Sequence, residues 1–339
     1  METEGIIKEI PKVEQHIHIV GAIRPETILW LIEESNIEDG PSSIGEVYEL
    51  LEFKDFNGFL RSYITIRNCI REERQFERII YEVLEDEAEQ NVMYVEAILS
   101  PREHVMRVGL DYCRMMKSIG RGIRKARRDF GVDCRLKIDL VRDFGPEMGK
   151  ETLEMIREYD EYVVAIDLGG SEHLYPPKLF KDVYESAREM DLHLTAHAGE
   201  VVGSESIWDA INLLKVERVG HAVSAKEDPE LINHMRKVGV SVEACPTSNV
   251  LTGAVKSIRE HPIRLFFNLG VNVTVNSDDP TLFRTSINNE YLRLYRELGF
   301  TIHELYQLSL NAVESSFLST EEKAKLRRRI EWQKEKMLS

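Results

Sequence analysis

Short apolar runs alternate with longer amphipathic stretches along the whole chain. Eight runs are rich in Val, Ile and Leu and have the length of a buried strand: residues 12–20, 92–99, 135–143, 162–168, 192–197, 218–223, 240–245 and 271–279. Between them, apolar residues recur at three- and four-residue steps, and each such stretch starts at a proline or Asp-Pro, as helices often do: residues 25–37, 176–190 and 228–239. Strands that alternate with helices predict βαβ units and a parallel sheet.

The number of predicted strands points to one fold class. Eight candidates in one uninterrupted series predict an α/β fold of the (β/α)8, or TIM-barrel, type. Residues 21–91 would then hold extra helices after the first strand, and residues 285–337 predict several more at the C-terminal end. A doubly wound open sheet is the alternative, although no GxGxxG motif follows the first strand. Since no Pro/Gly/Ser-rich linker interrupts the chain, we expect residues 1–339 to form one domain, where length alone would allow about two.

The charge balance narrows the choice of partner. The chain has 44 Lys and Arg against 59 Asp and Glu, a formal net charge of −15, which argues against nucleic acid or an anionic membrane surface. No stretch reaches the roughly 18 apolar residues of a membrane span, and residues 1–15 lack the apolar centre of a secretory signal. Four cysteines without a CxxC pair suit a reducing compartment. We therefore expect a cytoplasmic protein with a small-molecule partner, and no feature of the sequence marks an oligomer interface.

Ionisable residues stand where several predicted strands end. His16 and His18 are two residues apart, so on a strand both imidazoles point to the same side. That pair alone is weak evidence for a metal site, because core or exposed histidines are commoner than ligands. Further strand-like runs end in His197, His221 and Asp278–Asp279. Strand C-termini converge on one mouth of a (β/α)8 barrel, and buried ionisable groups need partners, so together these residues predict a divalent-cation site.

The types of donor indicate which metal would bind. Imidazole and carboxylate groups without thiolate suit zinc, with one coordination position left for water. Glu200 lies three residues after His197 in HAGE, where a turn would bring it over the same mouth. It is either a proton donor or an acid at the start of the next helix, where the helix dipole favours it. Cys245 is expected to be a small buried residue rather than a ligand.

Several motifs follow one another in a specific order from about residue 11 to residue 317: PKVEQHIHIVGAIRPETI, DLGGSE, TAHAGE, RVGHAV, EACPTSNVLTGAV, HPIRLFFNLGVNVTVNSDDP and NNEY. In this order, and above all in HAGE, CPTSN and SDDP, the chain resembles the adenosine deaminase family of the amidohydrolase superfamily. The family's fold is the same (β/α)8 barrel. The H-x-E and P-C-x-x-C motifs of the cytidine-deaminase type of zinc deaminase are absent.

The resemblance implies a role for each residue of this mouth. One zinc ion would be held by His16, His18, His197 and Asp278. The metal would lower the pKa of a bound water, which attacks C6 of a purine, and Asp278 would accept the water proton. Glu200 would donate a proton to N1, while His221 would orient the water and stabilise the developing charge. The net reaction is 6-aminopurine plus water to 6-oxopurine plus ammonia.

The resemblance also assigns contacts to the substrate, a purine nucleoside. Asp279 would hydrogen-bond purine N7, and the Gly170 backbone N–H would meet N3. Glu243 and Ser248 are candidates for residues that support the metal ligands.

Aromatic residues after the first strand are candidates for a lid. Phe59 and Tyr63 fall where the family packs aromatic rings over the ribose. A pair at i, i+4 is more commonly ordinary helix core, and Phe56 could serve instead.

Two positions depart from the family pattern. The family usually has an acid two residues after the second histidine, which in adenosine-specific members accepts a hydrogen bond from the ribose 5′-hydroxyl. Here that residue is Val20, and Ile98 stands where many members have arginine. Our hypothesis is a substrate with an apolar or bulky 5′ end, such as 5′-methylthioadenosine, 5′-deoxyadenosine, S-adenosylhomocysteine or aminodeoxyfutalosine. Alternatively, another residue supplies the 5′ contact and adenosine remains the best substrate.

Other functions remain open at the level of the sequence. Another single-metal amidohydrolase, acting on adenine or a related aminated ring, would use the same residues. A phosphoesterase usually needs two metals and a basic phosphate clamp, which the sequence does not show. A catalytically inactive binding relative should have lost Glu200 or a metal ligand, and none is lost.

Overall fold

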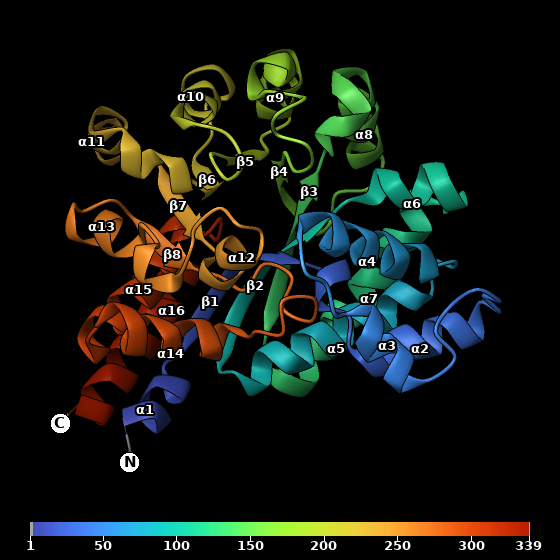
Figure 1. The fold of residues 1–339 in the computed structure, drawn as a ribbon, viewed down its shortest axis with the longest axis horizontal. Helices are drawn as coiled ribbons and strands as arrows, with labels where there is room; N and C mark the ends of the chain where they lie inside the picture. The colour runs from blue at the N-terminus through green and yellow to red at the C-terminus, as the bar shows by residue number, and fades with distance from the viewer. Residues whose placement is uncertain (1–2, 339) are drawn as a thin grey trace.

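Eight parallel strands follow one another around a single sheet in the order of the chain (Figure 1). They are β1 (Lys12–His18), β2 (Val92–Leu99), β3 (Asp133–Asp139), β4 (Val163–Asp167), β5 (His193–Ala198), β6 (Arg218–His221), β7 (Ser241–Ala244) and β8 (Val273–Val275). The sheet closes because Asp278 N donates to His16 O at 2.9 Å and His18 N donates to Asp278 O at 2.8 Å. The computed structural model describes residues 3–338, apart from the side chains of residues 56, 57 and 338. The predicted (β/α)8 barrel is confirmed, and the open doubly wound sheet is excluded.

Helices connect the strands and surround the sheet (Figure 1). Helix α1 (Thr3–Glu9) precedes β1, and the predicted extra helices after it are η1 (Val20–Ala22), α2 (Pro25–Glu34), α3 (Ile44–Leu50), α4 (Phe56–Cys69) and α5 (Gln75–Glu89). The following connections hold α6 (Pro101–Val108), α7 (Tyr112–Phe130), η2 (Arg142–Phe144), α8 (Gly145–Glu158), η3 (Pro177–Phe180), α9 (Lys181–Glu189), α10 (Ser204–Asp209), η4 (Ala210–Leu214), η5 (Val223–Glu227), α11 (Pro229–Val238), α12 (Pro246–Leu251), η6 (Ile258–Glu260) and α13 (Ile263–Asn268). The predicted C-terminal helices are α14 (Ile287–Leu298), α15 (Ile302–Ser315) and α16 (Thr320–Leu338).

Six of the eight strands end earlier than the apolar runs predicted. The runs at 12–20, 135–143 and 271–279 give strands that stop at residues 18, 139 and 275. Val141 has φ 47° and Asp278 has φ 66°, both in the left-handed region, so the backbone leaves the extended conformation near these residues. The sequence pattern did not indicate where these strands end, because the residues that follow them have the same mixture of apolar and polar side chains as the strands.

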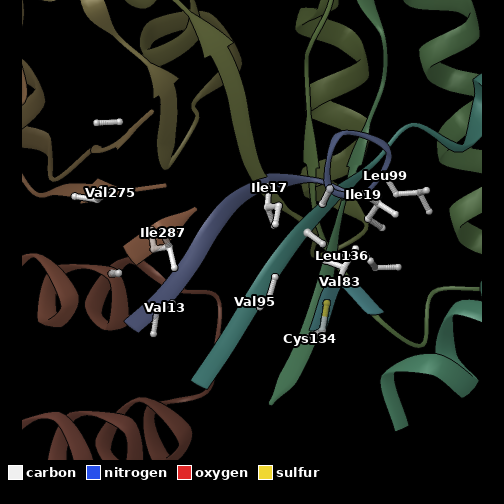
Figure 2. Packing of buried hydrophobic residues seen from close by; sticks show 14 of the residues in the cluster. Val13, Ile17, Ile19, Val83, Val95, Leu99, Cys134, Leu136, Val275 and Ile287 are labelled. Atoms are coloured by element: carbon white, nitrogen blue, oxygen red, sulfur yellow. The ribbon is translucent and has the colours of Figure 1, made fainter. Parts of the chain in front are cut away.

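Side chains that face outward from the strands form an apolar layer under the helices. Figure 2 shows part of it, with Val13, Val95 and Leu136 on three neighbouring strands. Lys137 contacts Glu243 across the barrel, so the preceding residue on β3, Leu136, must face the helices. Burial of this layer from water is the main force that holds the helices on the barrel.

The interior of the barrel is charged, where barrels of this type usually hold branched apolar residues. Lys137 Nζ lies 2.8 Å from Glu243 Oε2, and Arg218 Nε lies 2.7 Å from Glu243 Oε1. Arg218 also pairs with Glu96, and all four side chains are buried. Buried charges are tolerated only when they are paired and hydrogen-bonded, so these contacts hold the opposite walls of the barrel in one arrangement.

The loop between α15 and α16 covers the N-terminal end of the strands. Its Phe317 ring lies 3.8 Å from the guanidinium of Arg218, and Phe317 N donates to Glu96 Oε1 at 2.7 Å. The opposite, C-terminal end is where the candidate site lies. Among the described residues, no helix combines the length and the apolar character that crossing a bilayer requires.

Candidate active site

The predicted metal-binding residues come together at the C-terminal ends of the strands. The Nε2 atoms of His16 and His197 lie 3.1 Å apart. Asp278 Oδ1 lies 3.3 Å from His18 Nε2 and 3.6 Å from His16 Nε2. The ring centroid of His221 is 5.0 Å from that of His16. Side chains from β1, β5, β6 and the segment after β8 thus meet at one mouth.

Two of these residues have unusual backbone conformations. His221 has φ 64° and Asp278 has φ 66°, although neither is glycine. Non-glycine residues rarely adopt this left-handed conformation, and where they do, it often belongs to a functional site. Here it turns the chain sharply as it leaves the barrel.

Two carboxylates inside the barrel accept hydrogen bonds from two of the imidazole rings. His16 Nδ1 lies 2.7 Å from Glu243 Oε2, and His197 Nδ1 lies 3.1 Å from Asp167 Oδ1. Because a carboxylate accepts a hydrogen bond, each Nδ1 carries a proton, and in the neutral rings each Nε2 presents its lone pair. The two Nε2 atoms lie 3.1 Å apart, so two such lone pairs repel each other unless a cation, either a proton on His197 or a metal ion, lies between or beside them. The residues present therefore fit a divalent metal ion.

The pKa values of the histidines also bear on whether these residues can bind a metal. Burial, and then the other cationic groups nearby, lower the pKa of His16 and His18 well below the usual value, which keeps these imidazoles neutral. Burial also disfavours charge on His197, but the carboxylates of Asp167, Asp278 and Asp139 outweigh it and raise its pKa to about 9. Neutral imidazole is the form that binds metal, so a cation would compete with the proton on His197.

Cys245 and Ser248 lie close to this cluster. The sulfur of Cys245 lies within 4.8 Å of ligand atoms of His16 and Asp278. Burial raises the pKa of the Cys245 thiol well above its usual value, and metals bind the thiolate rather than the thiol. Burial raises the pKa of Asp278, and the nearby Ser248 hydroxyl offsets a small part of that rise.

Glu200 lies over the mouth and is held by two donors. Its Oε1 accepts hydrogen bonds from Asn249 Nδ2 at 3.2 Å and from Thr252 Oγ1 at 3.1 Å. Its Oε2 is 3.6 Å from His221 Nε2. Burial raises the pKa of Glu200, which favours the protonated form that a proton donor needs.

The loop that carries Glu200 is fixed by another carboxylate. Glu172 is buried and accepts hydrogen bonds from Gly199 N at 2.5 Å and from Val201 N at 3.0 Å. The residues on both sides of Glu200 are thereby held, so its side chain has a defined direction.

Asp279 and Gly170 have features expected of residues that meet a ligand. Within the described part of the chain, the buried Asp279 Oδ1 has no hydrogen-bond partner, which is costly unless a ligand supplies one. A Cβ on Gly21 would collide with the Asp279 carboxylate, so the chain passes close beside it. Gly170 has φ 97°, and a Cβ there would collide with Asp143, so only glycine presents its backbone at this point.

The two positions that depart from the family pattern are both buried. Val20 is 5% exposed and starts η1, two residues after the end of β1. Ile98 is 1% exposed, and in the sheet it stands between His18 on β1 and Lys137 on β3. Neither side chain can accept a hydrogen bond.

Aromatic rings gather between α4 and the segment after β8. The rings of Phe59 and Phe283 are stacked, with centroids 4.9 Å apart and planes at 22°. Phe53 contacts both, and Tyr63 lies 6.3 Å from Phe59. Phe59 therefore packs against the segment that carries Asp278 and Asp279. The side chain of Phe56 lies outside the described residues.

Sequence reasoning missed Asn249, Lys137 and Asp167. Asn249 follows β7 in CPTSN, and its amide contacts both Glu200 and His221. Lys137 and Asp167 support the histidines from inside the barrel. For Lys137 and Asp167, the available signal in the sequence was a charged residue inside an otherwise apolar predicted strand.

The comparisons with known proteins agree with this arrangement. The family model described as adenosine deaminase matches residues 11–333. The chain belongs to the adenosine deaminase family. It is 34% identical over 336 residues to the aminodeoxyfutalosine deaminase of Streptomyces avermitilis, covering 97% of this chain and 93% of that one. The crystal structure of an adenine deaminase from Arthrobacter aurescens matches with a TM-score of 0.91 at 31% identity, covering 96% of this chain and 99% of that one.

A further solved structure bears on the metal. An amidohydrolase from Burkholderia ambifaria with bound zinc matches with a TM-score of 0.89 at 27% identity, covering 99% of this chain and 94% of that one. The family match and these relatives identify the chain as a hydrolytic deaminase of adenosine- or adenine-type substrates.

Proposed function

We propose that the protein deaminates a 6-aminopurine nucleoside whose 5′ carbon carries an apolar or bulky group in place of the hydroxyl, with one zinc ion per chain. The observation that carries the catalytic part is the convergence of four imidazoles and Asp278 on one mouth, with Glu200 Oε2 3.6 Å from His221 Nε2. The observation that carries the substrate part is Val20. In this proposal residues 1–339 act as one domain.

The metal would be held by the side chains His16, His18, His197 and Asp278. When bound, zinc supplies a Lewis acid that makes water a nucleophile at neutral pH. Glu243 and Asp167 keep the His16 and His197 rings turned toward it through their Nδ1 atoms. Such supporting carboxylates also raise the basicity of the ligand rings.

Glu200, His221 and Asp278 would handle the protons. Water adds to C6 of the purine, so a C–O bond forms and electron density moves onto N1. Glu200 donates its proton to N1, and its burial, which raises its pKa, keeps that proton available. Asp278 accepts the proton from the attacking water. His221 orients that water and stabilises the charge that develops as it adds. Asp278 then passes its proton to the amino group, the C6–N bond breaks and ammonia leaves, and the proton of the C6 hydroxyl returns to Glu200 as the carbonyl forms.

Asp279 and Gly170 would orient the purine ring. N7 accepts hydrogen bonds, so Asp279 has to donate one. Burial, and then the neighbouring carboxylates, raise the pKa of Asp279 well above its usual value, which favours the protonated form. The Gly170 N–H would meet N3. With N1 at Glu200, these contacts leave the sugar on the side of β1 and β2, where Val20 and Ile98 lie.

An apolar pocket wall supports a substrate without a free 5′-hydroxyl. An aspartate at position 20 would accept a hydrogen bond from that hydroxyl, whereas valine leaves it unpaired. Phe59 and Tyr63 would cover the sugar side from α4. Similarity to an aminodeoxyfutalosine deaminase, at 34% identity, makes aminodeoxyfutalosine the first compound to test, followed by 5′-methylthioadenosine, 5′-deoxyadenosine and S-adenosylhomocysteine.

A substrate panel tests this proposal. Purified zinc-loaded protein is assayed by loss of adenine absorbance with adenosine, adenine and the 5′-modified adenosines at equal concentrations. We expect kcat/KM for the best 5′-modified compound to exceed that for adenosine by at least about tenfold, the scale of a pocket that selects apolar groups. A preference for adenosine or for free adenine contradicts the 5′ proposal. No turnover of any compound by the zinc-loaded protein contradicts the deaminase proposal itself.

A further inference from the structure

A chain of hydrogen bonds leads from the backbone of α13 to the candidate catalytic residues. Ile263 N donates to His261 Nδ1 at 3.2 Å. Because Nδ1 accepts, the proton of the neutral ring is on Nε2. His261 Nε2 then donates to Asn249 Oδ1 at 3.1 Å. The His261 ring is 3% exposed, and its burial, which lowers its pKa to about 3, keeps it neutral.

The donor from His261 fixes the orientation of the Asn249 amide. With Oδ1 accepting from His261, the two hydrogens of Nδ2 point the other way. They meet His221 Nδ1 at 3.0 Å and Glu200 Oε1 at 3.2 Å. The reversed amide would place N–H against N–H and oxygen against oxygen. Asn249 is fully buried, so water cannot relieve such a mismatch.

This orientation determines where His221 carries its proton. Nδ1 accepts from Asn249, so the neutral ring is protonated on Nε2. That atom faces Glu200 Oε2 at 3.6 Å. With Nδ1 accepting from Asn249 Nδ2, the ring presents an Nε2–H donor on the side of the mouth.

The same amide also determines where Glu200 carries its proton. Oε1 already accepts from Asn249 Nδ2 and from Thr252 Oγ1. The Thr252 hydroxyl can also accept, but the Asn249 amide can only donate here, so a proton on Oε1 would oppose that donor and resides instead on Oε2, which faces the mouth.

We infer that His261, acting through Asn249, is a positioning residue that places the protons of Glu200 and His221 on the atoms that face the substrate. The inference rests on the proposed function for the roles of Glu200 and His221, but the proton positions themselves can be measured without turnover. His261 does not touch substrate or metal in this scheme.

A matched pair of substitutions tests the inference. His261→Gln keeps an N–H donor close to the position of Nε2, whereas His261→Leu keeps bulk and removes the donor. We expect the Gln variant to stay close to the wild-type kcat and the Leu variant to lose about 10- to 100-fold, the scale of misplaced catalytic groups. KM and bound zinc should change little in either. Equal kcat values in the two variants would overturn the inference.

A spectroscopic measurement keeps the inference testable if the Leu variant does not fold. Nitrogen-15 NMR of histidine-labelled, zinc-loaded wild type separates protonated from unprotonated ring nitrogens, and the His221 signals are assigned by their loss in His221→Gln. We expect His221 protonated on Nε2 and bare on Nδ1. A proton on Nδ1 overturns the inference, even if the protein is an active deaminase. If instead the proton is on Nε2 but no adenine compound is turned over, the proposed function fails and the proton placement stands.

Discussion

Lys137 Nζ lies 2.8 Å from Glu243 Oε2 inside the barrel, and neither side chain is exposed to solvent. The same ammonium lies 3.3 Å from Asp167 Oδ2. These two carboxylates hold the Nδ1 atoms of His16 and His197. One buried cation thus contacts both supports of the candidate metal site.

Removing this cation should destabilise the fold. Lys137→Met leaves Asp167 and Glu243 with less compensating charge, and breaking a buried pair in this way costs about 3–5 kcal/mol. Arg218 still contacts Glu243, so we expect the lower end of that range. The midpoint of denaturant unfolding measures it. Lys150→Met is the control, because the Lys150–Glu147 pair is exposed and such pairs contribute little. Equal midpoints for the two variants would contradict the role of Lys137.

Replacing Glu200 should separate metal binding from turnover. Glu200→Gln keeps the shape and the acceptor for Asn249 and Thr252, but it removes the acidic proton. We expect unchanged zinc content and a loss of kcat of at least about 100-fold, the usual contribution of a general acid. Adenine absorbance and metal analysis measure the two effects. Glu205→Gln, at an exposed position in α10, serves as the control. A near-normal kcat in the Glu200→Gln variant would rule out the proton-donor role.

Restoring an acid at position 20 should move the substrate preference. Val20→Asp provides an acceptor for a ribose 5′-hydroxyl, and it places a charge against an apolar 5′ group. We expect the ratio of kcat/KM for adenosine to that for 5′-deoxyadenosine to rise at least about tenfold. Val238→Asp, at the exposed end of α11, is the control and should leave the ratio unchanged. A ratio that does not move in Val20→Asp would show that another residue reads the 5′ position.

His104 predicts a specific acid sensitivity. Its ring is buried edge-on against Phe76, and burial, with the nearby charge of Arg67, lowers its pKa from 6.5 to about 3. The unfolded chain therefore takes up a proton below pH 6.5 that the folded chain does not, so this group's contribution to stability is lost as the pH falls from 6.5 toward 3.

The substitution His104→Gln should remove this loss of folding stability at acidic pH. Relative to wild type, the free energy of unfolding of the variant should improve by about 1.4 kcal/mol for each pH unit below 6.5. Denaturant unfolding at pH 7 and pH 5 measures the difference. His303→Gln, at an exposed position in α15, should show no such trend. A parallel fall of wild type and His104→Gln would contradict the assignment.

The strand order and the meeting of the site residues could be predicted from the sequence, because the fold itself brings strand ends together. His16, His197 and Asp278 are far apart in the chain, but His16 lies in the second half of an apolar run and the other two stand at or near the ends of theirs, and a barrel places such positions at one mouth. The regular geometry of parallel strands does this without any knowledge of side-chain contacts.

Contacts across the barrel could not be predicted in this way. Lys137 and Glu243 lie on β3 and β7 and meet only because the sheet closes with a particular register. The orientation of the Asn249 amide depends on which atom of His261 carries a proton, and that depends in turn on one backbone N–H of α13. Such relationships follow from side-chain positions that an apolar pattern does not encode.

Gly21 has a consequence for how this pocket can diversify. It is adjacent to Val20, and any side chain on it would collide with the carboxylate of Asp279. Residue 21 is therefore closed to change, whereas position 20 already carries a side chain beside it. A mutant library aimed at new 5′ groups should randomise residue 20 and leave residue 21 as glycine.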